Sequence, residues 1–482
     1  MSIQVAKKEL ESLTAFQRDI HVTNDMSEEI ASLFYRTFLK STWFSSVLMK
    51  LRSANDSDDV VYHVNNSFHF LLYSYMRFVL PPIKVKSDFI GRVKIAWCHN
   101  VGTNITHRAV FREDDDVYQT WDNIWTDIYF QFYQNAGPGK RENHNIGIGN
   151  VECIEGWNDY LPSYPINVDQ PWFYSMDHSL AFPIFYKNSE TRAEHRYQFR
   201  RKVVDLLRVK ILGKDRKWHP TTRNIHRYLD IDPKLTIKEP ELWGRYAYIT
   251  EPEIKWYKCK QNRTFYTRDI EICDTPNPYK YKSTSELSLQ CTNPCLALFW
   301  VAENQDAVFV HNYSNYTTDS ENVYGGWDPI KTTTLSYGTI KRLDNMPSDH
   351  FSIAEPRKHF PSSPSERGYH AHSYAWDSTD FNGDVGITFA GLNANLACKI
   401  DNNSIYNNSV FDDDDDDDDP DEIADFIADD NTPQHTKHSN KIETITDESL
   451  SPNFIVRSRL LIVRKFTITS GDEADKYKFS IK

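Results

Sequence analysis

Short runs of aromatic and β-branched residues, separated by turn formers, dominate the hydrophobic pattern of this chain. Runs of this length and composition predict β-strands, and clusters such as "NAGPGK", "DNNSIYNNS" and "FNGD" predict turns between them. The predicted strands lie at residues 92–98, 127–133, 181–186, 203–212, 244–249, 296–302, 307–313, 332–338, 370–376, 385–391, 394–400 and 459–469.

Helix signals are few by comparison. The clearest is "SEEIASLFYRTFL" (27–39), where Ser27 is a candidate cap and apolar residues follow at 30, 33, 34 and 38, a helical spacing. A parallel α/β sheet needs a helical segment after nearly every strand, and no internal period of 20–50 residues indicates a repeat protein. The pattern therefore predicts an all-β sandwich, barrel or jelly roll.

A polar stretch, "TEPEIKWYKCKQNR" (250–263), separates two strand-rich halves. A chain of 482 residues has room for two β domains of ordinary size. We predict a partly helical segment at 1–40, one β domain at 41–255 and a second at 256–482.

The charge of the chain is concentrated in one segment of the second half. Of 68 acidic residues, 13 lie between Asp412 and Asp430, where eight consecutive aspartates occur and no basic residue is present. The other 55 acidic residues balance 55 basic ones, so this segment carries the whole formal charge of −13. Adjacent aspartates repel and cannot be buried, which predicts a disordered, solvated loop at about 408–450 between two late strands.

Elsewhere the charges are mixed, which argues against a nucleic-acid-binding surface. The best basic cluster, "HRYQFRRKVVDLLRVKILGKDRK" (195–217), is interpreted as a strand pair with one basic, solvated face, and contact with a genome is the lesser alternative.

The N-terminus shows no secretory signal, and no apolar run approaches the roughly 20 residues of a membrane helix. Seven cysteines, an odd number at low density, indicate reduced thiols. We expect a cytosolic protein.

Two constellations resemble metal sites. His370 and His372 lie two apart on a predicted strand and so project to one face, with Asp377 nearby, an arrangement typical of non-haem iron or cupin-type sites. A four-cysteine zinc site would need residues 259, 273, 291 and 295, of which only "CTNPC" is closely spaced. Packed or solvated side chains are the favoured interpretation of both. With no nucleophile elbow, phosphate loop or dinucleotide fingerprint, we predict no catalytic residues and no enzyme.

Read in order, the segments resemble the double jelly-roll major capsid proteins of nucleocytoplasmic large DNA viruses, the iridovirus, asfarvirus and phycodnavirus group. In the second half, "WDPIKTTTLSYGTIKRLDNMPSDHFSIAEPRKHF" (327–360) and "GYHAHSYAWDSTDFNGDVGITFAGLNANLACKI" (368–400) are similar to successive family segments. The first-half matches are "WCHNVGTNITHRAVF", "GKRENHNIGIGN" and "SLAFPIFYKNSETRAEHRYQF", and "LWGRYAYITEPEIKWYKCKQN" resembles the family's junction between jelly rolls.

This resemblance implies two consecutive eight-stranded antiparallel jelly rolls with long loop insertions and few short helices. It implies a major capsid protein that forms homotrimeric, pseudo-hexameric capsomers tiling the icosahedral shell of a large double-stranded DNA virus. The expected partners are neighbouring capsomers, minor capsid proteins and, through such partners, an internal membrane layer, with no sequence-specific nucleic acid. The expected location is the virion, after assembly in the host cytoplasm, and no cofactor or metal is implied.

Two alternative functions stay open at this point. One is a cupin-like or glycan-binding β protein with a metal at His370, His372 and Asp377, and another is a minor capsid component of the same fold. The aromatic stretch "DVYQTWDNIWTDIYFQFY" (116–133) fits a subunit interface and an ordinary sheet core equally well. The acidic loop would give charge repulsion or bind cations if it lies on the outer surface, which is preferred to an inward position facing DNA.

Overall fold

The structure is a computed structural model. It describes residues 44–56, 59–133, 156–186, 192–232, 235–238, 240–258, 262–276, 278, 283–378, 393–400, 453–470 and 477–481. The predicted helix at 27–39, the predicted strand at 385–391 and the acidic segment at 408–450 lie outside the described residues.

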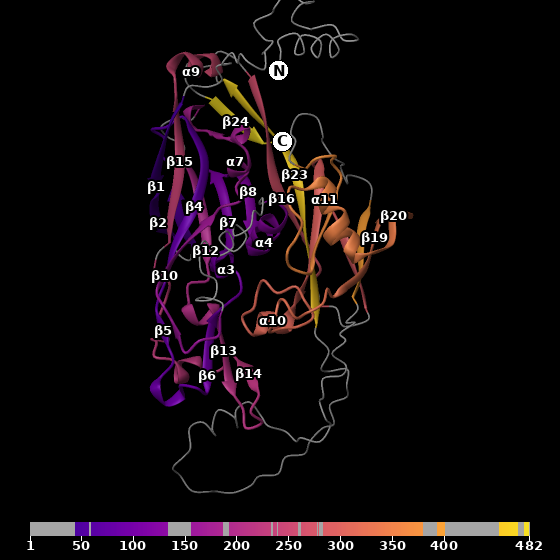
Figure 1. Ribbon diagram of the computed structural model, residues 1–482. Coiled ribbons are helices and arrows are strands. Elements are labelled where there is room, and N and C mark those ends of the chain that lie inside the picture. The colour runs from indigo at the N-terminus through magenta and orange to yellow at the C-terminus, as the bar shows by residue number, and fades with distance from the viewer. Residues whose placement is uncertain are drawn as a thin grey trace, which may run out of the picture.

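Two antiparallel sheets form the first jelly roll, on the left in Figure 1. One has the order β1-β15-β4-β10, with β11 also paired to β4, and the other has the order β2-β3-β12-β7-β8. Their strands are β1 (Phe44–Lys50), β15 (Glu241–Ile249), β4 (Phe70–Leu80), β10 (Tyr164–Asp169), β11 (Phe182–Pro183), β2 (Arg52–Asp56), β3 (Asp59–His63), β12 (Ala193–Phe199), β7 (Thr106–Glu113) and β8 (Asp116–Asp122).

Two smaller sheets extend the first jelly roll toward the lower end of the view in Figure 1. They have the orders β14-β13-β6 and β5-β9. Their strands are β14 (Trp218–Thr221), β13 (Leu207–Leu212), β6 (Val93–Trp97), β5 (Ile83–Lys84) and β9 (Tyr160–Leu161).

The second jelly roll consists of two four-stranded antiparallel sheets, β16-β23-β18-β21 and β17-β22-β19-β20, with β24 added beside β23. The all-β prediction of two consecutive antiparallel jelly rolls is therefore confirmed. The strands are β16 (Asn262–Asp274), β23 (Phe454–Ser470), β18 (Cys295–Asn304), β21 (Tyr369–Ser373), β24 (Tyr477–Ile481), β17 (Thr284–Leu289), β22 (Ala394–Ile400), β19 (Ile330–Tyr337) and β20 (Ile340–Pro347).

The described helices are short. They are α3 (Val101–Ile105), α4 (Asn123–Phe132), α7 (Phe173–Met176), α8 (Ile225–Tyr228), α9 (Glu251–Lys258), α10 (Gln305–Phe309) and α11 (Pro356–His359), with 3-10 turns η1 (Ser87–Phe89), η2 (His178–Leu180), η3 (Ile184–Tyr186) and η4 (Val203–Leu206) and the π-helical turn η5 (His350–Ala354).

Two predicted strands, 127–133 and 307–313, are wrong, because α4 and α10 occupy much of these ranges. In both cases a side chain just before the aromatic run caps a helix. The Asp122 carboxylate accepts a hydrogen bond from the Trp125 amide at 2.9 Å, and the Asn304 side chain accepts one from the Asp306 amide at 3.0 Å. Such caps satisfy free amides of the first helical turn, and local periodicity alone does not distinguish a short buried helix from a strand. The 3-10 turns η3 and η4 likewise replace part of the predicted strands 181–186 and 203–212.

The polar stretch at 250–263 contains α9 and connects β15 to β16. In the part of the chain that the structure describes, strands β1 to β15 pair only with one another, and strands β16 to β24 do the same. We propose a domain boundary at residues 255/256 on this basis. None of the helices described is both long and apolar enough to span a bilayer.

Strand β18 lies between two hydrophobic cores, one shared by both jelly rolls and one belonging to the second jelly roll alone. Its continuous apolar sequence is typical of a strand covered on both faces. Because side chains alternate along a strand, Ala297, Phe299 and Val301 join the large hydrophobic core that also fills the first jelly roll. Leu298 and Trp300 point the other way, into the separate core of the second jelly roll.

Candidate functional site

The histidines of the predicted metal site lie on one face of β21 but bind different carboxylates. His370 Nε2 lies 2.8 Å from Asp328 Oδ2, and the His370 ring stacks on Trp300. His372 Nδ1 lies 2.9 Å from Glu355 Oε1. Asp377 is exposed beyond the end of the strand. Among the described residues no group of three or more His, Cys, Asp or Glu side chains could hold a metal ion, so the structure does not bring the predicted ligands together.

The cysteines of the alternative zinc site are free thiols where the structure describes them. Cys273, Cys291 and Cys295 belong to the second jelly roll, whereas Cys259 lies outside the described residues. Burial raises the pKa of all three described thiols, to about 11 for Cys291. A raised pKa keeps a thiol protonated near neutral pH, which disfavours metal binding and nucleophilic chemistry.

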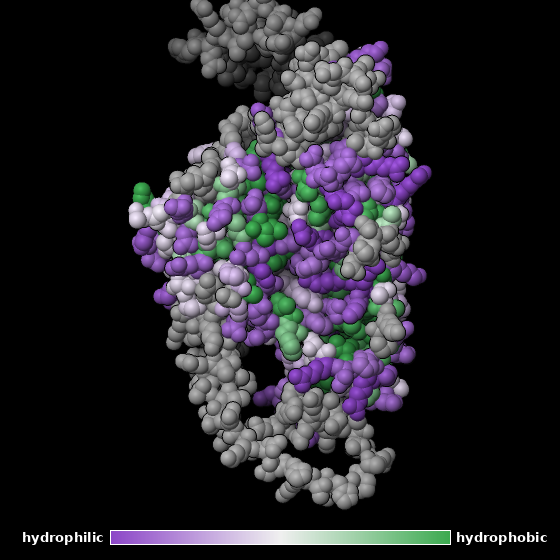
Figure 2. Space-filling model, turned by 180° about the vertical axis from the view of Figure 1, so that it is seen from behind, coloured by the Kyte–Doolittle hydropathy of each residue, from purple (hydrophilic) through white to green (hydrophobic). Residues whose placement is uncertain are grey.

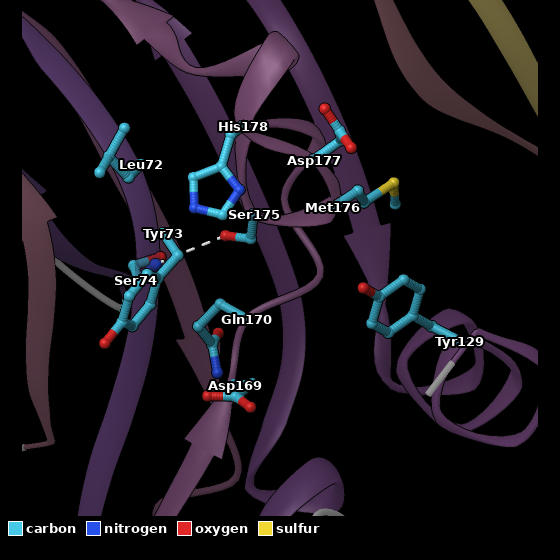
Figure 3. A pocket seen from close by; sticks show the side chains of 10 residues that line it. All are labelled: Leu72, Tyr73, Ser74, Tyr129, Asp169, Gln170, Ser175, Met176, Asp177 and His178. Atoms are coloured by element: carbon cyan, nitrogen blue, oxygen red, sulfur yellow. Dashed lines mark hydrogen bonds between the residues drawn. The ribbon is translucent and has the colours of Figure 1, made fainter. Parts of the chain in front are cut away.

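A polar cavity of about 390 Å³ lies in the first jelly roll beside α4. Figure 3 shows Gln170 between Ser175 and Asp169, with Tyr129 across the cavity. Asp177 accepts a hydrogen bond from the Ser179 amide at 2.7 Å and so caps η2. Burial lowers the pKa of Arg268, and the nearby Tyr129 and Asp177 oppose that effect. The carboxylates of Asp169 and Asp177 therefore give the cavity lining negative charge, and Asp177 interacts with the buried guanidinium of Arg268. Its lining residues are Leu72, Tyr73, Ser74, Tyr129, Asp169, Gln170, Ser175, Met176, Asp177 and His178.

The contact between the two jelly rolls is the most elaborate arrangement in the molecule, and we take it as the candidate functional site. Helix α4 presents Trp125 and Phe132 to Phe299 of β18, with ring centroids 5.7 and 5.2 Å apart. Phe360 closes the same cluster at 5.5 Å from Phe132. Aromatic pairs at these separations add to the stabilisation from buried area. Most of the stretch 116–133 is therefore buried within the chain, where α4 packs against the second jelly roll, and Asp116 and Val117 are exposed.

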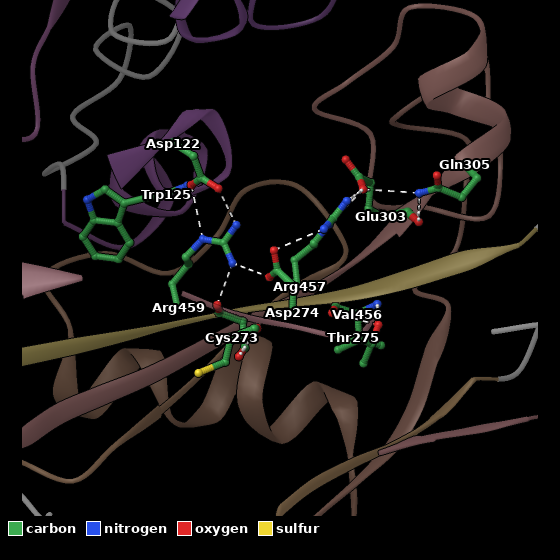
Figure 4. A network of polar contacts seen from close by, with 11 residues as sticks. Asp122, Trp125, Cys273, Asp274, Thr275, Glu303, Gln305, Val456, Arg457 and Arg459 are labelled. Carbon is green, nitrogen blue, oxygen red and sulfur yellow. Dashed lines mark hydrogen bonds and ion pairs between the residues drawn. The ribbon is translucent and has the colours of Figure 1, made fainter. Parts of the chain in front are cut away.

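A network of charges around one buried arginine crosses the same contact (Figure 4). The fully buried Arg459 of β23 pairs with Asp122, the cap of α4, and with Asp274 of β16, whose Oδ1 is 2.6 Å from Nη1. Asp274 also binds Arg457, which reaches Glu303 at 2.9 Å. Burial alone would raise the pKa of Asp122, but the Arg459 guanidinium outweighs it and holds that pKa below its usual value.

A polar loop, residues 311–328, is the third part of the contact, and its buried residues include Asn312 and Ser314 to Thr317, with Val323. It extends from the second jelly roll onto the first: Ser314 Oγ lies 2.6 Å from Asn104 Nδ2, the Tyr313 hydroxyl donates to the Asp205 carbonyl at 2.8 Å, and the Tyr316 hydroxyl donates to Asp127 at 3.0 Å. Buried polar groups are costly unless hydrogen-bonded, so these bonds fix one position of the loop.

Asp127 makes this contact sensitive to pH. Burial raises the pKa of Asp127 to about 6, although Ser314, Thr103 and Tyr316 donate hydrogen bonds that oppose the shift. A carboxyl with a raised folded-state pKa binds its proton more tightly in the folded protein, so its contribution to stability is lost as pH rises from about 4 to about 6.

We therefore expect Asp127→Asn to gain stability relative to the wild type by up to about 3 kcal/mol between pH 4 and pH 7.5. Urea unfolding at a series of pH values would measure the difference. Asp205→Asn is a control, because the Tyr313 contact uses the Asp205 carbonyl and not its carboxyl. Parallel stability curves for the wild type and Asp127→Asn would contradict the prediction.

Sequence reasoning did not find the charged network, although one signal was available. Arg457 and Arg459 lie two apart in "FIVRSRLLIV", so two cations project from one face of an otherwise apolar strand. A buried cation needs a carboxylate, but the partners Asp122, Asp274 and Glu303 are distant in sequence and only the fold identifies them.

Comparison with known proteins agrees with this architecture. Residues 263–428 match the family model described as "Large eukaryotic DNA virus major capsid protein". The major capsid protein of Invertebrate iridescent virus 6 is 25% identical over 373 residues, covering 71% of this chain and 77% of that protein. That of Lymphocystis disease virus 1 is 26% identical over 399 residues, covering 77% and 83%.

The chain is similar in sequence to these capsid proteins. Among solved structures, the Faustovirus major capsid protein matches with a TM-score of 0.65 at 8% identity, covering 95% of this chain and 96% of that one. PBCV-1 VP54 matches with a TM-score of 0.63 at 12% identity, covering 93% and 99%. The family match begins within β16, the first strand of the second jelly roll of this chain.

Proposed function

We propose that the protein is a major capsid protein whose subunits associate as trimers in the icosahedral shell of a large double-stranded DNA virus. The observation that carries the proposal is the fixed contact between two jelly rolls within one chain, in a sequence similar to this family. Three subunits would offer six jelly rolls, which suits a pseudo-hexagonal capsomer. A three-fold ring uses heterologous contacts that close on themselves.

Exposed apolar residues support association between copies. Figure 2 shows hydrophobic side chains reaching one face in several separate groups among hydrophilic ones. Strand β1 is the clearest case, because Phe44, Val47 and Leu48 are exposed and β15 is the single described strand beside it. An exposed apolar edge strand is a site where another chain can add. We infer that β1 contributes to subunit contacts.

The mass of the purified protein in solution tests the proposal. Light scattering should give three times 56.4 kDa, the mass of one chain. Val47→Glu should reduce the trimer fraction, whereas Ile353→Glu, also at an exposed apolar residue, is the matched control. A wild-type monomer would oppose the trimer, and a trimeric Val47→Glu variant would exclude β1 as the contact.

The acidic segment gives a further expectation. It lies between β22, which ends at Ile400, and β23, which begins at Phe454. Deleting residues 410–447 should leave the protein trimeric and shift the melting temperature by less than about 2 °C, because the deletion removes no described strand. Failure of the shortened chain to fold would contradict this.

We further propose that the shell is the capsid of a virion that is assembled in the host cytoplasm. Neighbouring capsomers and minor capsid proteins are the proposed partners. A minor capsid component of the same fold is the second candidate, and the abundance of the chain in virions separates the two. We infer a structural role and not a catalytic one, since His370 and His372 bind Asp328 and Glu355.

A further inference from the structure

A pocket on the first jelly roll is lined by basic and apolar residues. It has a volume of about 240 Å³ and lies where the end of β12 meets residues 236–238 and Pro240. Arg200, Arg201 and Lys238 supply its charged groups, and no carboxylate is among the described residues that line it. Its remaining lining residues are Val60, Ile105, Phe199, Thr236, Ile237 and Pro240. We call it the basic pocket.

Its cations are largely without counter-charges. Arg200 donates to the Asn104 carbonyl at 2.9 Å, and its guanidinium lies 4.3 Å from the centre of the Tyr313 ring. Arg201 and Lys238 are exposed and make no ion pair with any residue that the structure describes. Asp59, beside the lining residue Val60, has no described ion pair either. Cations gathered over an apolar floor create a local positive potential that attracts anions.

The walls of the basic pocket are fixed by the backbone. The Ile237 amide donates to the Arg201 carbonyl at 2.9 Å, and the Val203 amide donates to the Leu235 carbonyl at 3.1 Å. Lys202 and Thr236 form an antiparallel bridge between these bonds. The charged groups are therefore carried on a rigid support, which lowers the entropic cost of binding a ligand.

The chain itself contains a ligand of complementary charge, the 13 acidic residues between Asp412 and Asp430. The chain that follows this segment is next described at Asn453, whose carbonyl accepts from the Gln305 amide at 2.9 Å. Gln305 is eight residues before Tyr313, which contacts Arg200, so these two points are at most about 29 Å apart at roughly 3.6 Å per residue. The 23 residues from 431 to 453 can extend about 75 Å. The acidic residues can reach the basic pocket.

We propose that the basic pocket binds the acidic segment 412–430 of the same chain. Carboxylates pair well with guanidinium and ammonium groups, and tethering gives the segment a high effective concentration. Binding rests on exposed charges, so it should weaken as ionic strength rises and the screening length falls below about 10 Å. The proposal does not depend on the trimer, since the pocket and the Asn453 contact belong to one subunit.

Zero-length carbodiimide cross-linking of the full chain tests the proposal, because it joins an amine to a carboxylate only when they are in contact. Mass spectrometry should find Lys238 and Lys202 joined to peptides containing Asp412 to Asp430. Exposed Lys255, on α9, serves as the reference amine and should be joined to these peptides at least fivefold less. Equal yields at Lys238 and Lys255 would overturn the proposal.

Variants of the basic pocket and of the acidic segment test the same contact. Arg201→Glu should reduce the Lys238 cross-link at least fivefold, whereas Arg357→Glu, at another exposed arginine, should not change it. Replacing the eight aspartates 412–419 with asparagine should also reduce it. An unchanged yield in Arg201→Glu, with unchanged melting temperature as the check on folding, would overturn the proposal.

In a mixture of ¹⁴N and ¹⁵N chains, the cross-links should join peptides of the same label. Mixed-label products would assign the segment to a neighbouring copy and overturn the same-chain proposal. A DNA duplex added at the concentration of the protein should leave the yield unchanged. Loss of the cross-link would identify the basic pocket as a site for a phosphate backbone instead.

Discussion

Replacing Arg459 with methionine should lower the free energy of unfolding by about 3–5 kcal/mol, since it leaves two half-buried carboxylates without their shared, fully buried cation. Arg459 is fully buried and pairs with Asp122 and Asp274 at once. Asp122 also caps α4, so loss of the cation weakens the cap position that holds α4 at the contact between jelly rolls. Urea unfolding followed by tryptophan fluorescence measures the loss, with Trp125 next to the cap as one reporter.

Two further variants are compared with Arg459→Met. Arg457→Met is the matched control, because Arg457 is partly exposed and its removal leaves Asp274 still paired with Arg459. We expect a loss of about 1–2 kcal/mol for that variant. The double variant Asp122→Asn with Arg459→Met should lose less than the sum of the single changes, since asparagine can still cap the helix. Equal losses for the two arginine variants would contradict a special role for the buried one.

Phe299→Ala should have an effect of similar size, about 3–5 kcal/mol, because it opens a cavity where the two halves meet. Phe299 is fully buried and its ring packs against those of Trp125, Phe132 and Phe360. The cavity lies in the core that both jelly rolls share, so the variant should also separate their unfolding into two transitions. Hydrogen exchange along the chain would show which half opens first.

Phe351→Ala is the control for this separation. Phe351 is also fully buried, but it packs on Trp300 in the core that belongs to the second jelly roll alone. Its loss should destabilise the second jelly roll without adding a transition in the first. If both variants unfold with the same exchange pattern, the shared core does not couple the two halves as argued.

The sequence predicted the parts of the fold that local pattern determines. The continuous apolar run 296–302 is strand β18, and the alternating run 394–400 is within β22. The errors at 127–133 and 307–313 have a common cause, since a single capping side chain, Asp122 or Asn304, decides between helix and strand. The aromatic content of these segments does not indicate whether they form a helix or a strand.

The candidate site was less predictable, for a different reason. Its contacts join residues that are hundreds of positions apart, such as Asp122 with Arg459, and one sequence gives no measure of which carboxylate meets which arginine. The histidine pair illustrates the converse case. Its spacing on β21 was correctly interpreted as placing both rings on one face, but the carboxylates Asp328 and Glu355 that bind them come from other segments.

The position of β23 in its sheet sets the order in which a newly made chain can mature. β23 lies between β16 and β18 and pairs with both, yet it begins at Phe454, far along the chain from α4, which ends at Phe132. At roughly 5–20 residues per second, the ribosome delivers β23 tens of seconds after α4 has emerged. Until then Trp125 and Phe132 of α4 have no completed sheet to cover them. Nascent chains thus pass through an aggregation-prone stage, and cellular factors that shield apolar surfaces during translation should raise the yield of native subunits.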